Sequence, residues 1–477
     1  MSAQSQWLPI SDIAAKVQSG ELKARDLVEK SLKSIADKKE YDAIIATLEK
    51  RALERADEID ARVAKGEKIG PLAGVPFIAK DNFLVFGADT TAASNILKGF
   101  EAPYQSTAIN RLEAAGAICA AKGNLDAFAI GSSTENSDFF TTKNPHDKTR
   151  VSGGTSGGPA ASVVLDMVPF AVGTDTGGSI RQPASFSGCV GYKPTYGLVS
   201  RSGVVAAASS TDTIGPLART VDDAALVLDV VAGKDPLDST TVERQDSYLL
   251  DNGSQIKDVK VGVIKEYLVE GLDKVVRSVI ESAIQKLKDA GADIQEISLP
   301  SMPLSLAVYY ILVPAEESSN LSRYDGQRYG YSYAGAKDLN EKYTKSRGLG
   351  FGKEVKRRIM VGTYVLSSGY YDAYYKKAQT VRTKLINEYN EAFPKVDYLL
   401  GPTAPTTAFK IGENANDPLK MYLADVMTVG ASLSGIPAIN IPGGMSDGLP
   451  VGLQLMAPQR KDKELLGFAK QVEELIK

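Results

Sequence analysis

Two glycine-rich runs lie close together in the sequence, and a serine stands near the end of the second. They are residues 152–161 (SGGTSGGPAA) and residues 173–181 (GTDTGGSIR), which include Ser179. Glycine pairs let a backbone turn sharply, and consecutive N–H groups in such a turn can converge on developing negative charge. A serine hydroxyl beside that turn would be placed to attack a carbonyl carbon, so the segment favours acyl transfer.

Two other interpretations of the glycine pairs compete with acyl transfer. A phosphate-binding loop would need the spacing GxxxxGK[ST], which neither run has, and no lysine follows the glycines. A plain tight turn would account for the glycine pairs equally well if nothing else in the sequence matched.

A serine nucleophile needs a base, and the sequence offers few. The only histidine, His146, lies within NPHDK and is interpreted as a surface or turn residue, and metal sites made of several histidines are impossible. Lys80 is the remaining choice, because an apolar run at residues 75–79 leads into it from an expected buried strand. It could act as a base only if burial lowered its pKa by roughly 3 units; in water it would be an ordinary solvated charge.

Composition excludes several classes of function. The 477-residue chain has a net charge of -3, so it carries no excess of basic charge for nucleic acid or an anionic membrane. No run has the apolar length of a membrane span, and the first residues lack the layout of a signal peptide. Cys119 and Cys189 make no disulfide framework and are expected to be buried apolar residues, which favours a cytoplasmic protein.

Helical and strand patterns alternate along the chain. Strands are expected at residues 117–122, 259–264, 292–299 and 396–400, and helices at 106–115, 220–232 and 273–290. Ser106 and Thr220 are the expected caps of the first two helices. The alternation predicts an α/β fold with helices on both faces of a large, mostly parallel or mixed sheet.

Several runs in the sequence resemble the amidase-signature family. They include GVPFIAKDN, GNLDAFAIGSSTENS, RVSGGTSGGPAA and GTDTGGSIRQPASFSGCVGYKPTYGLVSR, and the similarity continues to GLPVGLQLMAP near the end of the chain. The resemblance implies one domain over residues 1–477 with the fold of that family. Within it we expect a mainly helical segment at 1–65, a catalytic core at 66–220 and a helical insertion at 300–395.

The same resemblance implies a serine–serine–lysine triad. Ser179 corresponds to the nucleophile and Lys80 to the base. The oxyanion hole corresponds to the backbone N–H groups of Thr176, Gly177 and Gly178. The middle serine of the family lies 24 residues before the nucleophile, where this chain has Thr155, so the sequence departs from the family at a catalytic position.

Thr155 can be interpreted in three ways. A threonine keeps the hydroxyl that could relay a proton between Lys80 and Ser179, but it adds a methyl group and stiffens χ1. The family holds this position with a cis peptide bond, which a β-branched residue fits more tightly. Thr155 relays protons as the serine would, or Ser156 takes over through a local shift, or the site is impaired.

Within the family, the chain most resembles the branch that supplies ammonia in tRNA-dependent amidotransferases. That branch holds glutamine by its α-carboxylate and α-ammonium groups, which a guanidinium and a carboxylate can bind. The corresponding positions are Arg358 for the carboxylate, Asp425 for the ammonium, Tyr309 nearby, and Gly131 and Ser132 in the pocket wall. Tyr310 and Arg357 are adjacent alternatives to two of them.

The resemblance therefore implies a glutaminase subunit. Ammonia would pass to a B subunit that activates a misacylated tRNA with ATP and Mg²⁺, and a small C subunit would clasp the pair. The tRNA, Glu-tRNA(Gln) or Asp-tRNA(Asn) or both, would be bound mainly by the partner, and this chain would need no metal or organic cofactor. The alternatives are a stand-alone amidase for small carboxamides and a catalytically silent scaffold, which only Thr155 favours.

Overall fold

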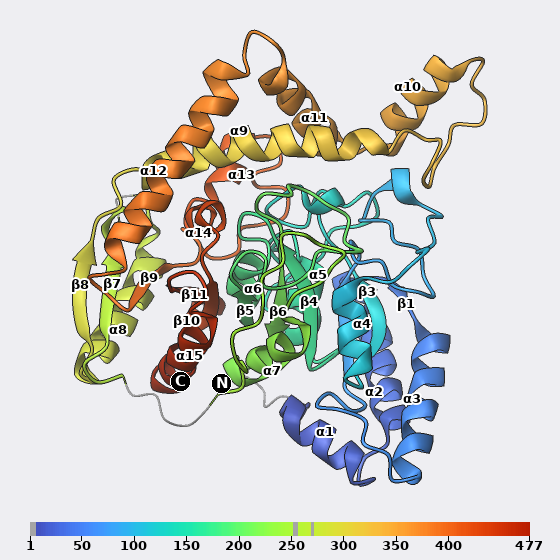
Figure 1. Ribbon diagram of the computed structural model, residues 1–477, viewed down its shortest axis with the longest axis horizontal. Helices are drawn as coiled ribbons and strands as arrows, with labels where there is room; N and C mark the ends of the chain where they lie inside the picture. Colours follow the sequence, from blue (N-terminus) through green and yellow to red (C-terminus); the bar gives the residue numbers. More distant parts are fainter. Residues whose placement is uncertain (1–5, 251–255, 269–270) are drawn as a thin grey trace.

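One sheet crosses the whole molecule (Figure 1). The computed structural model describes residues 6–250, 256–268 and 271–477, so residues 1–5 of the expected N-terminal helical segment lie outside the described part. The sheet has 11 strands in the order β1-β3-β2-β4-β6-β5-β10-β11-β9-β7-β8. They are β1 (Ile44–Thr47), β2 (Pro76–Lys80), β3 (Ile118–Gly123), β4 (Phe170–Asp175), β5 (Val190–Lys193), β6 (Thr213–Ala218), β7 (Lys260–Ile264), β8 (Asp293–Ile297), β9 (Tyr398–Pro402), β10 (Ala438–Ser446) and β11 (Leu449–Met456).

The sheet combines parallel and antiparallel pairs, which confirms the predicted mixed sheet. β2 runs parallel to β3 and β4, and β7 runs parallel to β8 and β9. The other neighbouring strands pair antiparallel. The five strands expected from the sequence, including the buried strand before Lys80, are β2, β3, β7, β8 and β9.

Helices pack on both faces of this sheet, as predicted. They are α1 (Ile10–Gln18), α2 (Ala24–Asp37), α3 (Glu49–Ala64), α4 (Thr107–Ala114), α5 (Gly157–Val164), α6 (Arg181–Ser187), α7 (Val221–Val231), α8 (Lys274–Asp289), α9 (Met302–Asn320), α10 (Leu339–Gly350), α11 (Lys353–Leu366), α12 (Lys377–Ala392), α13 (Pro418–Leu423), α14 (Val429–Ser434) and α15 (Asp462–Ile476). Phe77 and Ala79 of β2 share a core with α7, whereas Ile78 between them shares another with α5 and α6. Successive strand residues point to opposite faces, so these two cores lie on opposite sides of the sheet.

Local capping fixes where several helices begin. The Thr220 side chain accepts a hydrogen bond from the N–H of Asp223 and so caps α7, as predicted. Asp273 caps α8 in the same way through the N–H of Val275. The expectation for Ser106 is wrong in detail: it occupies the N-cap position of α4 without a capping bond from its side chain. Its backbone N–H instead donates to the carbonyl oxygen of Leu84 at 2.9 Å.

A group of helices formed by residues 302–392 lies at the top of the view in Figure 1. Within it α9 and α11 approach each other closely at Gly362, where a Cβ atom would come within 1.8 Å of the carbonyl oxygen of Pro314. Only glycine permits that contact, so the two helices can lie side by side along the pocket described below. The division of the chain into one domain with an insertion stays a prediction.

Three smaller expectations can be compared with the structure. Cys119 and Cys189 are buried and free, and His146 is exposed in a bend of the backbone, all as predicted. Among the residues that the structure describes, no helix has the length and apolar character needed to cross a membrane.

Candidate active site

The sheet itself brings the expected base to the glycine–serine segment. β2 and β4 are parallel neighbours, with Ala79 level with Val172. The carboxyl ends of parallel strands lie at the same edge of a sheet, so Lys80 at the end of β2 meets the end of β4. Its Nζ atom donates to Thr174 Oγ1 at 2.9 Å.

Lys80 also contacts the threonine that replaces the family's serine. Its Nζ atom lies 2.5 Å from Thr155 Oγ1, and the lysine has no exposed surface. Burial lowers the pKa of Lys80 to about 7, although the nearby carboxylates of Asp126, Asp175 and Asp212 act in the opposite direction. The lysine can therefore be neutral near pH 7, which is what a proton acceptor requires.

Thr155, rather than Ser156, faces the lysine. The peptide bond between Gly154 and Thr155 is cis. The Ser156 hydroxyl donates to the carbonyl oxygen of Thr174 at 3.3 Å, and its backbone N–H donates to the carbonyl oxygen of Ser179 at 3.1 Å. The two glycine-rich runs are thus joined directly beside the expected nucleophile.

Ser179 stands on a turn between β4 and α6 that only glycines can form. Gly178 has φ +135°, and a Cβ atom there would lie 2.2 Å from Thr428 Oγ1. A Cβ atom on Gly177 would lie 2.4 Å from the phenol ring of Tyr309. These close approaches explain the glycine pair, and the turn leaves Ser179 only 7% exposed.

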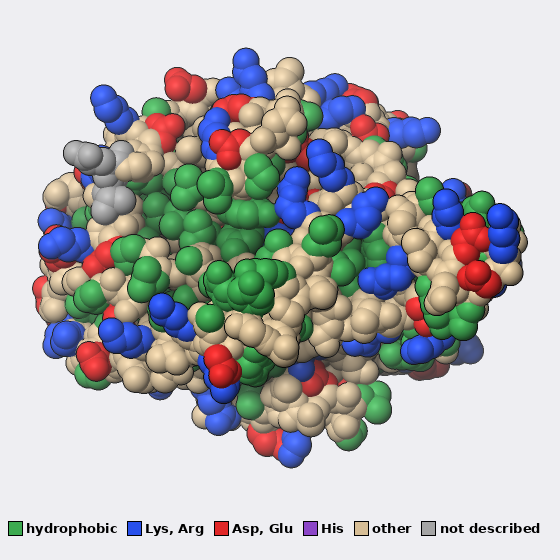
Figure 2. Space-filling model, turned by 90° about the horizontal axis from the view of Figure 1, so that it is seen from above, with side chains coloured by type: hydrophobic (Ala, Val, Ile, Leu, Met, Phe, Trp, Pro, Cys, Tyr) green, Lys and Arg blue, Asp and Glu red, His purple; other side chains and the backbone are tan. Residues whose placement is uncertain are grey.

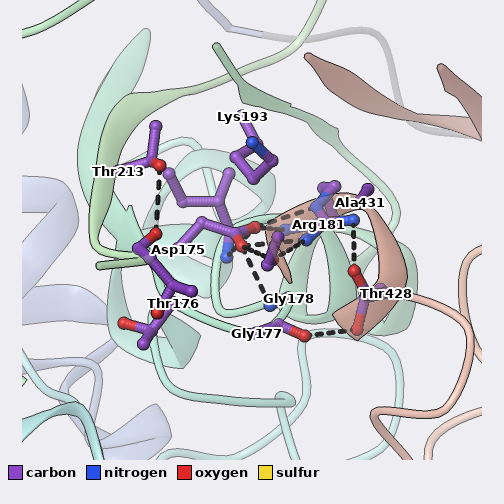
Figure 3. A network of polar contacts seen from close by, with 12 residues as sticks. Asp175, Thr176, Gly177, Gly178, Arg181, Lys193, Thr213, Thr428 and Ala431 are labelled. Carbon is purple, nitrogen blue, oxygen red and sulfur yellow. Dashed lines mark hydrogen bonds and ion pairs between the residues drawn. The ribbon is translucent and has the colours of Figure 1, made fainter. Parts of the chain in front are cut away.

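The structure differs from the sequence prediction at one expected oxyanion donor. The N–H of Gly178 donates to Asp175 Oδ1 at 2.9 Å (Figure 3). The Asp175 carboxylate lies inside the turn, against the beginning of α6. It also accepts a hydrogen bond there from the N–H of Ile180. Gly178 therefore shapes the turn, while its N–H is not directed at a substrate.

A buried ion pair anchors this turn to a distant part of the chain. Arg181 Nη2 lies 2.9 Å from Asp175 Oδ1, and neither side chain is exposed. Arg181 also donates to Gln454 Oε1 at 2.6 Å, to Ser432 Oγ at 2.9 Å and to the carbonyl oxygen of Thr428 at 3.1 Å. Burial alone would raise the pKa of Asp175, but the Arg181 guanidinium holds it below its ordinary value.

The expected carboxylate-binding residue, Arg358 of α11, is buried in a wall made by three segments. Its Nε atom donates to Glu354 Oε1 at 2.9 Å. Its guanidinium lies 4.6 Å from the ring centre of Tyr310 on α9 and 5.0 Å from that of Tyr422 on α13. The side chain of Arg357, the adjacent alternative, is 36% exposed and pairs with Glu354.

Asp425 closes the same wall. It accepts hydrogen bonds from Ser132 Oγ and Tyr310 Oη, both at 2.7 Å. Burial raises the pKa of Asp425 to about 6. The predicted set is thus brought together, with Tyr310 between Asp425 and Arg358, and Tyr309 against Gly177 on the catalytic turn.

Two further residues, Asp126 and Gln182, position these segments and were missed from the sequence. Asp126 accepts hydrogen bonds from three backbone N–H groups, those of Ser133, Thr134 and Asn136. Gln182 accepts from the N–H of Gly154 at 2.7 Å and donates to the carbonyl oxygen of Ser132 at 2.9 Å. In the sequence, the only indication of their role is that each polar side chain lies within a run of small residues. Gly131, at φ +157°, packs directly on Asp126, which leaves no room for a side chain.

Comparison with known proteins agrees with this geometry. The family model described as Amidase matches residues 26–466. The chain belongs to the amidase family. Curated members include the A subunits of glutamyl-tRNA(Gln) amidotransferase from Carboxydothermus hydrogenoformans and Caldanaerobacter subterraneus, which are 49% and 50% identical to it. The alignments cover 97% and 98% of this chain and 96% of each relative.

Solved structures of this amidase family share the fold. In its crystal structure, the A subunit of glutamyl-tRNA(Gln) amidotransferase from Thermotoga maritima is 40% identical, with a TM-score of 0.81, and the match covers 97% of this chain and 94% of that one. The native peptide amidase from Stenotrophomonas maltophilia is 28% identical, with a TM-score of 0.83 over 99% of this chain and 97% of its own.

Proposed function

We propose that this chain is the glutaminase subunit of a tRNA-dependent amidotransferase, in which it hydrolyses the side-chain amide of glutamine. The observation that carries the proposal is the buried contact of 2.5 Å between Lys80 Nζ and Thr155 Oγ1, beside the turn that bears Ser179. The two curated amidotransferase relatives, about half of whose residues are identical to this chain, support the same conclusion.

Acylation follows from the order of these groups. Neutral Lys80 accepts the hydroxyl proton of Thr155, and Thr155 takes the proton of Ser179 as the serine oxygen attacks the amide carbon. The carbon–nitrogen bond then breaks, and the proton returns from Lys80 through Thr155 to the departing ammonia. Water hydrolyses the resulting ester by the reverse proton path and releases glutamate.

The negative charge of the tetrahedral intermediate falls beside the glycine turn. Because Asp175 already occupies the N–H of Gly178, we assign the oxyanion hole to the N–H groups of Thr176, Gly177 and Ser179. Donors that are fixed before the reaction begins stabilise such a charge most effectively. Asp175 and Arg181 fix them by holding the turn against α6.

Glutamine would be recognised by opposite charges at its α-carbon. Arg358 would bind the α-carboxylate, and Asp425, oriented by Ser132 and Tyr310, would bind the α-ammonium group. Tyr309 would lie between this end of the substrate and the turn at Gly177. Gly131 keeps the loop of Ser132 close to Asp126.

We further propose the partner subunits that the relatives' name implies. A B subunit would use ATP and Mg²⁺ to activate the misacylated tRNA and consume the ammonia, and a C subunit would complete the complex in the cytoplasm. The face seen in Figure 2 supports a role within a larger complex, because hydrophobic side chains gather in a hollow there. A mostly apolar cavity of about 660 Å³ has Ala424, Val426 and Met427 among its lining residues.

A stand-alone amidase is the second candidate, because the peptide amidase has the same fold. The two candidates differ in their use of Arg358. We expect Arg358→Ala to raise KM for glutamine by roughly tenfold to a hundredfold, since it removes a charge-assisted hydrogen bond, and to leave KM for a simple carboxamide nearly unchanged. Equal losses for both substrates would show that Arg358 is structural and would contradict glutamine recognition.

A further inference from the structure

A second buried carboxyl group lies against Arg358 and is not used by the mechanism above. Glu317 of α9 is only 2% exposed. Its Oε2 atom is buried and, among the residues that the structure describes, has no hydrogen-bond partner. The nearest cation is Arg358, whose Nη1 atom lies 3.9 Å away, which is too long for a hydrogen bond. A buried oxygen without a partner is costly, so this one calls for an explanation.

The charges around Arg358 balance only while no substrate is bound. Its Nε atom already pairs with Glu354, and Glu317 adds a second carboxyl group on its Nη side. Glu354 also pairs with Arg357, so two guanidiniums face two acidic groups before any substrate is bound. A third carboxylate, the α-carboxylate of glutamine, would add a negative charge without a counter-ion in a place shielded from water.

The other groups that face Glu317 cannot neutralise this added charge. Glu354 on α11, Asp212 on the segment before β6 and Glu316 on α9 are all acidic, and Arg358 supplies the opposing charge. Burial raises the pKa of Glu317 to about 7, so a proton is available to it at neutral pH. Asp425 is a second carboxyl group with a raised pKa, of about 6. Its hydrogen bonds are with Ser132 and Tyr310.

We propose that Glu317 is the counter-ion of Arg358 in the free site and takes up a proton when the substrate's α-carboxylate replaces it. The exchange leaves the number of negative charges beside Arg358 unchanged, so Glu317 couples the binding of an acidic substrate to the uptake of a proton. This inference rests on the proposed function, because it requires a substrate carboxylate at Arg358. It adds that glutamine affinity falls as pH rises, whereas an amide without a carboxylate is unaffected.

The binding of glutamine to the Ser179→Ala protein, which cannot turn it over, tests the proposal. We expect Kd to rise about tenfold between pH 6 and 8, as binding that takes up one proton requires when the group titrates near 7. Titration calorimetry in buffers of different ionisation enthalpy should show close to one proton taken up at pH 8. Adding Glu317→Gln should abolish both effects. Glu316 is the matched control, because its carboxylate pairs with Ser210, and Glu316→Gln should retain both effects.

The outcomes separate this inference from the proposed function. Glutamine that binds without proton uptake, or a pH dependence that survives Glu317→Gln, would overturn the role of Glu317 alone. Failure of glutamine to bind at any pH would overturn the proposed function as well. The uptake measurement needs no change at Glu317, so a misfolded Glu317→Gln protein would not prevent a decision.

Discussion

Lys80 shows how burial changes the chemistry of a single residue. In water its ammonium group would stay protonated far above neutral pH. At the end of β2 it has no exposed surface, and burial lowers its pKa to about 7. The same burial that costs solvation free energy thus produces a group that can be neutral near pH 7, with its Nζ atom 2.5 Å from the Thr155 hydroxyl oxygen.

The pH dependence of turnover should report this lysine. With a simple carboxamide as substrate, kcat should rise with pH through about 7 and then level off. The sign follows because protonated Lys80 has no lone pair to accept a proton, and the neutral form predominates above its pKa. Steady-state rates between pH 6 and 9 provide the measurement, and a rate that falls or stays flat across this range would contradict the role of Lys80.

Thr155 is expected to be an active member of the triad. Thr155→Val keeps the branched shape but removes the hydroxyl, so kcat should fall roughly 10²- to 10⁴-fold, while Thr155→Ser should remain active. Ser156→Ala is the matched control, because that hydroxyl donates to the carbonyl oxygen of Thr174 and its loss should cost far less. Unchanged turnover in Thr155→Val would exclude the relay.

At the scale of elements, the α9–α11 pair carries the residues of the proposed pocket for the substrate's charged end. α9 carries Tyr310 and Glu317, and α11 carries Glu354 and Arg358. Their spacing depends on Gly362, where the backbones nearly touch. We therefore expect the specificity of the site to depend on helix packing as well as on the side chains that line it.

Gly362→Ala should disturb this pair. The added Cβ atom would lie 1.8 Å from the carbonyl oxygen of Pro314, so the helices must separate. We expect a loss of about 1–3 kcal/mol in the free energy of unfolding and a higher KM for glutamine, with KM for a simple amide little changed. Gly348→Ala on α10, which meets nothing within 4 Å, should be neutral or slightly stabilising. Identical behaviour of the two variants would show that the close approach at Gly362 does not set the pocket.

At the scale of the whole molecule, Arg181 joins parts of the chain that are far apart in sequence. It links the catalytic turn to Ser432 on α14 and to Gln454 on β11. The ion pair with Asp175 is fully buried, so removing one partner leaves the other charge without compensation.

Arg181→Met should therefore destabilise the fold as well as the site. We expect the free energy of unfolding, measured by urea denaturation, to fall by roughly 3–5 kcal/mol. Arg62→Ala provides the comparison, because Arg62 pairs with Glu67 at the surface and such pairs contribute only about 0–1 kcal/mol. Similar losses in both variants would refute an anchoring role for Arg181.

Much of this structure could be predicted from the sequence. The helix capped by Thr220 follows from local rules, and the buried strand before Lys80 follows from its apolar run. The contact between Lys80 and Thr155 required the resemblance, because the two residues lie 75 positions apart and local patterns do not show which segments meet. The sequence could not separate Tyr309 from Tyr310, since adjacent helical residues point about 100° apart and the helix orientation depends on packing. Nor did it reveal that the Asp175 carboxylate would occupy the N–H of Gly178.

Ammonia release from glutamine tests the central claim most directly. The complex with the B and C subunits and misacylated tRNA should release ammonia with the wild-type chain, and Ser179→Ala should abolish the release while the complex still assembles. Release that persists in Ser179→Ala would contradict the assignment of the nucleophile. No release from an assembled wild-type complex would contradict the glutaminase function itself.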